Sequence, residues 1–141
     1  GEAAIPGHLD DHAYLVWGLL ELYGATFDNA YLERAIQVNA TMLDHFWDAE
    51  EGGLFLTADD AEELLVRQKE TYDGAMPSGN SVAMLNVLRL SHLTGDAGLA
   101  ERASEMGRAF STEAGRLPSG FAQMMSALDL ALGDGQEVVI V

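Results

Sequence analysis

The sequence contains no cysteine and only 7 lysines and arginines against 23 aspartates and glutamates. Without cysteine, a disulfide framework, thiolate catalysis and a cysteine-ligated metal are excluded, and a cytoplasmic location is expected. The formal net charge of −16 repels phosphate backbones and anionic headgroups, so we expect neither nucleic acid nor a membrane as partner. An acidic surface of this kind otherwise indicates solubility.

Long hydrophobic runs are also missing, which excludes a transmembrane helix. The chain does not open with the basic and apolar regions of a secretory signal, so no signal peptide is expected. Its first residues, GEAA, include no initiator methionine, which indicates a cut or processed chain. With 48% hydrophobic residues among 141, the composition is that of one globular domain.

Hydrophobic periodicity predicts five helices and an all-α fold. Residues 10–25, 80–94 and 120–132 are apolar around most of the helix circumference, as expected for helices inside a protein. Residues 30–47 and 97–111 are apolar along one stripe only, which is typical of a helix that covers a core. The order along the chain is therefore buried, covering, buried, covering, buried.

An internal repeat relates the two covering helices and the helices before them. Residues 19–35, LLELYGATFDNAYLERA, align without gaps on residues 87–103, VLRLSHLTGDAGLAERA, at an offset of 68. Asp28 and Asp96 occupy equivalent positions, where each would cap the helix that follows. The period is about twice that of tetratricopeptide or ankyrin units. Antiparallel helical hairpins of this length predict part of an (α/α) toroid, in which inner helices are ringed by outer ones.

About two and a half hairpins, over residues 1–135, are too few to close such a ring. We therefore expect the remaining hairpins of a larger barrel, or self-association, to cover the inner helices. In the connection between the second and third helices, GLFLT and ELLVR predict a short β-hairpin near 53–67. QEVVIV at 136–141 predicts the start of a strand that leads into a following segment.

Polar and aromatic residues gather where the inner helices begin. If these helices are parallel, their N-termini lie on one face, together with YDGAMPSGNS at 72–81. These residue types suit a polyhydroxylated ligand such as a sugar, with aromatic rings as stacking faces and carboxyl groups for proton transfer. The expected ligand-binding residues are Tyr14, Trp17, Tyr72, Asn80 and Ser81. The candidates for catalysis are Asp73, His12 and Asp11.

Each of these residues also has a structural interpretation. Ser78 or Asn80 would serve as the N-cap of the third helix. Asp11 would stabilise the start of the first helix through its dipole, and a lone histidine such as His12 is usually structural. Asp73 stands out because a cap of the third helix does not require it.

Motifs for metals and cofactors are missing. DAEEGG and TADDAEE lack the oxygen-ligand spacing of an EF-hand loop, and HExxH does not occur. The sequence also lacks a phosphate loop, a dinucleotide-binding fingerprint and a nucleophile elbow. We therefore expect no bound metal and no cofactor.

Four stretches together resemble one known family. They are DDHA at 10–13, FWDAEEGGLFLT at 46–57, YDGAMPSGNSVA at 72–83 and QEVVIV at 136–141. The set is similar to the spermatogenesis-associated, thioredoxin-domain-containing family, called YyaL-like in bacteria, over nearly the whole chain. The resemblance implies an (α/α)6 barrel of the six-hairpin glycosidase type. This chain would be an interior-to-late segment of that barrel, without the family's N-terminal thioredoxin-like domain.

The barrel implied by this resemblance is similar in fold to N-acylglucosamine 2-epimerases, cellobiose epimerases and unsaturated glucuronyl hydrolases. Because a fold does not carry a function, two hypotheses stay open. In the first, the parent protein binds or modifies carbohydrate, with His12 as the acid/base of an epimerase or Asp73 or Asp11 as the general acid of a hydrolase. In the second, the chain is a non-catalytic helical scaffold that binds a peptide or partner domain. In both, the isolated chain is expected to be inactive.

Overall fold

The computed structural model describes residues 7–60 and 67–133, and these residues are mostly α-helical. The helices are α1 (Leu9–Thr26), α2 (Asn29–Phe46), α3 (Gly79–Thr94), α4 (Ala97–Arg116) and α5 (Ala122–Leu132), with a short 3₁₀ helix at Pro118–Gly120. The predicted all-α class is confirmed, and each of the first four helices begins within one residue of its expected position. None of the described helices combines the length and the apolar character needed to cross a membrane.

The two copies of the sequence repeat also have the same structure at the start of their second helix. Asp28 and Asp96 each accept a hydrogen bond from the second residue of the following helix, at 2.9 and 2.8 Å. Both expected N-caps are therefore confirmed. The residues just before them, Phe27 and Gly95, both adopt the left-handed conformation, with φ of 55° and 71°. The two helix–turn–helix units thus share their turn geometry as well as their sequence.

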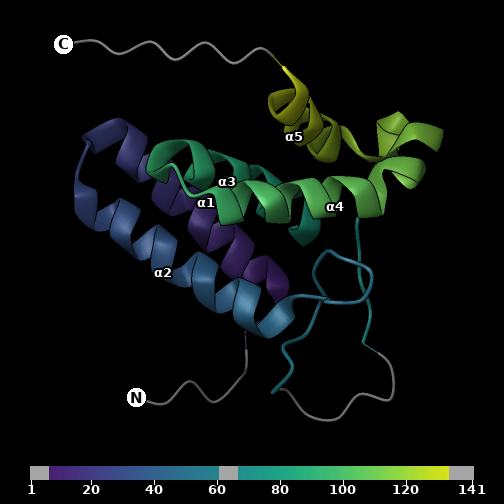
Figure 1. Ribbon diagram of the computed structural model, residues 1–141, viewed down its shortest axis with the longest axis horizontal. Helices are drawn as coiled ribbons and strands as arrows, with labels where there is room; N and C mark the ends of the chain where they lie inside the picture. Colours follow the sequence, from purple (N-terminus) through teal and green to yellow (C-terminus); the bar gives the residue numbers. More distant parts are fainter. Residues whose placement is uncertain (1–6, 61–66, 134–141) are drawn as a thin grey trace.

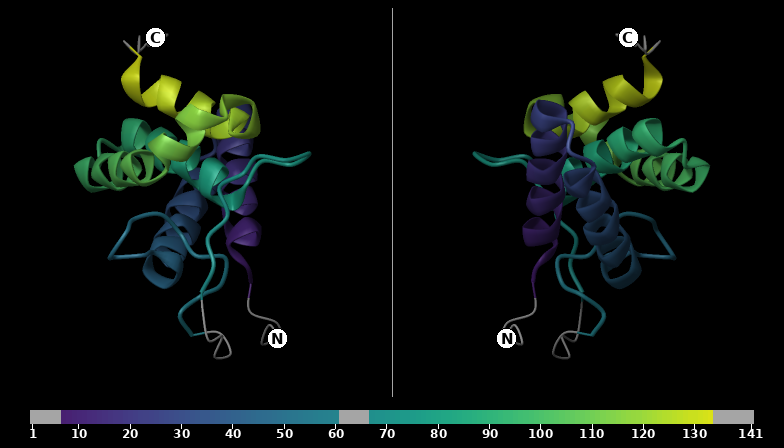
Figure 2. Two further views of the ribbon diagram at one scale, coloured as in Figure 1. Left: turned by 90° about the vertical axis from the view of Figure 1, so that its right-hand side faces the viewer. Right: turned by 90° about the vertical axis from the view of Figure 1, so that its left-hand side faces the viewer.

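Helix α3 lies between α1 and α5, while α2 packs on α1 and α4 packs on α3 (Figure 1). Figure 2 gives two side views in which α1 and α2 lie next to each other. Helices α1 and α3 run parallel, because Leu9 at the start of α1 contacts Gly79 at the start of α3, and Glu21 further along α1 pairs with Arg89 of α3. The arrangement is a row of three helices with two further helices against it.

The core is centred on α3, which is buried on nearly every side, as its sequence predicted. Helix α1 contacts α2 and α3, and α5 contacts α3 and α4, but each of these two helices keeps an open face at its end of the row. Leu15 and Leu22 of α1 are 49% and 45% exposed, and Met125 and Leu132 of α5 are 38% and 83% exposed. Apolar side chains at both ends of the row therefore lack a neighbouring helix in the described part of the chain.

The connection from α2 to α3 holds no strand among its described residues. Leu54 forms an isolated antiparallel bridge with Trp47, and the N–H of Leu56 donates to the carbonyl of Gln68 at 2.7 Å. The strand expected at 53–57 is therefore not formed. Most of its expected partner, at 63–67, lies outside the described residues, and so does the predicted strand at 136–141.

The backbone around Leu54 has a different partner from the one expected. Gly52 and Gly53 have φ of 79° and 83°, a conformation that interrupts an extended strand. Directly after this turn, both backbone groups of Leu54 bond to the side chain of Asn80 in α3. A side chain of the core helix therefore satisfies the backbone that a second strand was expected to satisfy.

Candidate functional site

The first turns of α1 and α3 meet beside the segment 70–81. The hydroxyl of Tyr14 donates to the carbonyl of Pro77 at 2.7 Å, which ties α1 to the residues just before α3. Gly79 lies so close to α1 that a Cβ there would clash with a carboxylate oxygen of Asp10 and would lie 2.9 Å from Cγ of Leu9. Only glycine permits this approach, so the glycine of the SGNS stretch allows the first turns of α1 and α3 to pack closely.

Asp73 is 8% exposed, and three backbone N–H groups occupy its carboxylate. Oδ1 accepts from Ser78 at 2.8 Å, and Oδ2 accepts from Gln123 at 2.9 Å and Met124 at 3.1 Å. Gln123 and Met124 are the second and third residues of α5, whose own N-cap residue, Phe121, provides no side-chain acceptor. As expected, the N-cap of α3 is a different residue, Ser78, but Asp73 has a capping role of its own. It caps α5 across the fold.

Asn80 and Ser81 are completely buried and bond within the protein. The amide of Asn80 accepts from the N–H of Leu54 and donates to the carbonyls of Leu54 and Glu70, each at 2.8 Å. The hydroxyl of Ser81 accepts from that of Ser78 at 2.9 Å. Ser78 is the N-cap of α3, one of the two residues expected in that role. Both expected ligand-binding residues thus join the long connection to α3.

Tyr14 and Trp17 form a half-buried aromatic pair on α1, with ring centroids 5.9 Å apart. Burial raises the pKa of the Tyr14 hydroxyl above its ordinary value, and the negative charges of Asp10 and Asp73 raise it further. The hydroxyl is therefore a firmly protonated donor, and Pro77 receives that hydrogen bond. The two rings keep part of their surface accessible, as a stacking site requires.

Tyr72 is 54% exposed and lies at the start of α5 rather than beside Tyr14. Its ring meets that of Phe121 edge to face, with centroids 6.2 Å apart. A Cβ added to Gly120 would lie 2.6 Å from Cε2 of Tyr72, so the glycine makes room for the ring. The three expected aromatic residues therefore form a pair on α1 and a separate ring near α5.

The remaining catalytic candidates, His12 and Asp11, bond within the first turn of α1. Asp11 accepts from the N–H of His8 at 2.8 Å, and Nδ1 of His12 lies 3.0 Å from the carbonyl oxygen of His8. The His12 ring packs against Phe46 of α2, with centroids 5.0 Å apart. It borders a hollow of about 270 Å³ between α1 and α2. His12 thus contacts α2, whereas Asp73 contacts the ends of α3 and α5.

An ion pair that the sequence analysis missed joins α1 to α3. The guanidinium of Arg89 donates to Glu21 at 2.6 Å, and this hydrogen bond lowers the pKa of the Glu21 carboxyl, with a further contribution from the Trp17 indole. Glu21 and Arg89 occupy the same position of the repeat, 68 residues apart. Opposite charges at equivalent positions of neighbouring inner helices were the available signal. The pair lies next to the aromatic pair on α1.

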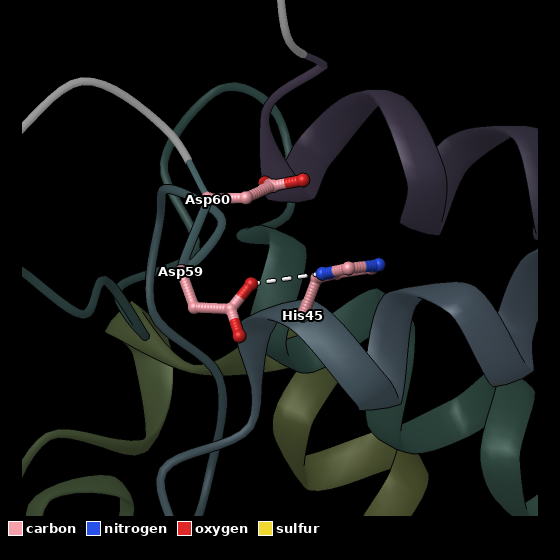
Figure 3. Close-up of side chains that lie close together, drawn as sticks. All are labelled: His45, Asp59 and Asp60. Carbon is pink, nitrogen blue, oxygen red and sulfur yellow. Dashed lines mark hydrogen bonds and ion pairs between the residues drawn. The ribbon is translucent and has the colours of Figure 1, made fainter.

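A second cluster lies at the end of α2, on the surface. His45 Nδ1 is 2.8 Å from Oδ1 of Asp59, and Asp60 comes within 4.8 Å of both (Figure 3). An imidazole and two carboxylates are ligands that divalent cations accept. Nδ1 of His45 already pairs with Asp59, however, and both side chains are exposed. We assign the cluster to an ion pair that fastens the connection to α2.

This ion pair predicts a pH-dependent signal from His45. The hydrogen bond to Asp59 raises the pKa of His45 above the ordinary 6.5, and the same bond lowers the pKa of Asp59 below 3.8. The pair therefore stabilises the fold between these limits, and its contribution is lost as pH rises through the folded pKa of His45 or falls through that of Asp59. In an NMR titration, Asp59→Asn is expected to move the His45 midpoint down toward 6.5. Asp60→Asn should move it less, and an unchanged midpoint in Asp59→Asn would contradict the assignment.

Comparison with known proteins identifies relatives that match nearly the whole sequence of this chain. The chain is 37% identical to human spermatogenesis-associated protein 20 and 36% identical to the rat protein, over 135 residues in each case. Homologues of this chain thus carry the name of the spermatogenesis-associated family. The family expected from the DDHA and YDGAMPSGNSVA stretches is therefore confirmed. The aligned region is 95% of this chain but only 17% of each relative, so the chain corresponds to one segment of a much longer protein. No family model matches the chain.

Proposed function

We propose that the chain supplies one wall of a binding cleft for a polyhydroxylated ligand, of which a sugar is the prime example, to a larger helical barrel. The observation that carries this proposal is the half-buried Tyr14–Trp17 pair on α1, with the Glu21–Arg89 ion pair beside it. Sugars present apolar faces that stack on aromatic rings and hydroxyl groups that bond to charged side chains. The α1–α3 surface offers both kinds of group.

The barrel part of the proposal is an (α/α) toroid, in which α1, α3 and α5 are inner helices and α2 and α4 are outer ones. Its support is the parallel packing of α1 and α3, the position of α2 and α4 outside that row, and the repeat of 68 residues. The exposed Leu15 and Leu22 of α1 and Met125 of α5 would then contact the remaining hairpins. Self-association of the chain is the other way to cover them.

The proposed role within this chain is binding rather than turnover. The carboxylate of Asp73 is engaged by three backbone donors, and Asp11 is engaged by the N–H of His8. A general acid must exchange its proton with a substrate, which these bonds oppose. His12 of an epimerase, or Asp11 of a hydrolase, would have to act in the assembled parent protein, and the isolated chain is expected to turn over no sugar.

A second candidate function is a non-catalytic helical scaffold for a peptide or partner domain. It is favoured by the internal bonds of Asn80 and Ser81, because these residues then serve the fold alone. The two candidates differ in a single respect that can be measured. The scaffold needs no small ligand at the aromatic pair.

The two tryptophans make a direct test, because they occupy different environments. Trp17 lies in the proposed wall, whereas Trp47 ends α2 beneath the guanidinium of Arg102, 4.5 Å from its ring centroid. In an NMR titration with mono- and disaccharides, the proposal predicts a saturable shift of the Trp17 indole and none of Trp47. Tyr14→Ala should weaken this binding, and Tyr72→Ala is the matched control on the other side of α3. A shift at neither indole would favour the scaffold.

A further inference from the structure

An open groove lies where α3, α4 and the end of α5 come together. Its volume is about 530 Å³, and its walls are largely apolar, with Leu88 of α3 and Leu128 of α5 among them. On α4 the wall consists of small residues apart from Arg108, and they include Gly107, where a Cβ would lie 3.3 Å from both Leu128 and Met84. Leu132, 83% exposed, stands at its edge. Together with the apolar walls, this side chain forms a continuous apolar surface of the kind that another element covers.

The repeat identifies what this surface corresponds to in the first hairpin. Besides Ala97, Ala100 and Ala103, four residues of α4 line the groove: Ser104, Gly107, Arg108 and Ser111. At the offset of 68, their equivalents in α2 are Ile36, Asn39, Ala40 and Leu43. These four residues, together with Asp44, line the seam between α2 and α4, opposite Leu99 and Arg102 of α4. The face of α2 that borders α4 therefore corresponds, in the repeat, to the open face of α4.

The equivalence holds in three dimensions, because α2 and α4 bury the same positions. Ala35, Val38, Met42 and Phe46 of α2 are all buried, and so are their equivalents Ala103, Met106, Phe110 and Ala114 in α4. The two helices therefore turn corresponding faces to their inner helices. Consequently, the neighbouring faces of α2 and α4 also correspond. The groove beside α4 is therefore the counterpart of the position that α4 occupies beside α2.

We propose that the groove receives a further amphipathic helix, equivalent to α4, from a part of the same protein outside this chain. Eight residues follow Gly133, and at about 1.5 Å of rise per residue they would form only about two helical turns, against the 20 residues of α4. The relatives supply the missing length, since this chain aligns with only 17% of theirs. A stack of repeated hairpins buries its faces through its neighbours, as this helix would do.

The lining defines the chemistry of the incoming helix. Ser104, Gly107 and Ser111 are smaller than Ile36, Asn39 and Leu43, so the groove leaves room for larger apolar side chains than the Leu99 that α4 presents to α2. Arg108, His92 and Asp96 supply polar groups to the same groove. A helix with one bulky apolar stripe and a polar flank fits this surface.

Single cysteines test the proposal, because the chain has none of its own. Ser104→Cys places a thiol in the groove, and Thr112→Cys places one at an exposed position of α4 that does not line it. Maleimide labelling of each site is followed by peptide mass spectrometry, in the full-length protein and in the 141-residue chain. In the full-length protein, Ser104→Cys is expected to label about tenfold or more slowly than Thr112→Cys, because the covering helix must first open. In the 141-residue chain the two sites should label at similar rates.

Two results would overturn this inference. Equal labelling of both sites in the full-length protein would mean that no element covers the groove. Labelling of Ser104→Cys in the 141-residue chain that slows as protein concentration rises would mean that a second copy of the chain fills it. The comparison of labelling rates in the full-length protein remains a valid test even if a variant of the 141-residue chain fails to fold.

Discussion

Asp73→Ala is expected to lower the free energy of unfolding by about 3 kcal/mol or more, since it removes a helix cap and leaves buried donors without a partner. The N–H groups of Ser78, Gln123 and Met124 all lose their acceptor at a site that is 8% exposed. The loss should affect α3 and α5 together, because one carboxylate bonds to the start of both. Denaturant unfolding of the two proteins measures the difference.

Asp96→Ala is the matched control, because Asp96 caps one helix at an exposed position. Its cost is expected to be about 1 kcal/mol, typical of a single N-cap. If Asp73→Ala lowers the free energy of unfolding no more than Asp96→Ala does, capping of α5 by Asp73 stabilises the fold no more than an ordinary N-cap. The same measurement is needed to interpret any functional effect of an Asp73 variant. A loss of sugar binding or turnover in an Asp73 variant indicates a role at a site only if the fold is still intact.

The local chemistry of the sequence was enough to predict the helices and most of their ends. Periodicity located all five helices, and the aspartates at 28 and 96 marked two starts correctly because a cap and its donors lie within three residues of each other. The same reasoning gave Ser78 or Asn80 as the cap of α3, and Ser78 is the residue in that position. These features depend only on residues that are neighbours along the chain.

The candidate site was harder to predict because its bonds join distant residues. Asp73 bonds to Gln123, 50 residues away, and Asn80 bonds to Leu54, 26 residues away. No spacing along the chain indicates such a pair. Both residues have the polar character of a ligand site, and their burial alone distinguishes the structural role. The strand expected at 53–57 also depended on a distant residue, because both backbone groups of Leu54 bond to the side chain of Asn80.

Repeat positions carried more information than single motifs. Glu21 and Arg89 are equivalent residues with opposite charges, and they meet between neighbouring parallel helices. Four residues of α2 that line the α2–α4 seam and four residues of α4 that line the open groove are equivalent in the same way. Comparing equivalent positions for charge and size would have indicated both contacts from the sequence, once the helices were known to be parallel.

Asn80→Ala is expected to lower the free energy of unfolding by about 3 kcal/mol, because two buried backbone groups and one partly buried carbonyl lose their hydrogen-bond partner. The groups are the N–H and carbonyl of Leu54 and the carbonyl of Glu70. The connection between α2 and α3 should then detach from α3 before the helices unfold. Faster hydrogen exchange of the Leu54 amide, at a denaturant concentration where the helices stay protected, would report this step.

Asn86→Ala is the matched control on the same helix. Asn86 is also fully buried, but it makes one hydrogen bond, from Nδ2 to the carbonyl of Ala13 at 2.8 Å, and its Oδ1 has no partner among the described residues. Both substitutions leave a similar cavity, so the difference between them isolates the hydrogen bonds. We expect Asn80→Ala to cost about 2 kcal/mol more than Asn86→Ala. Equal costs would mean that water replaces the lost bonds at Leu54 and Glu70, and Asn80 would again be free to serve a ligand.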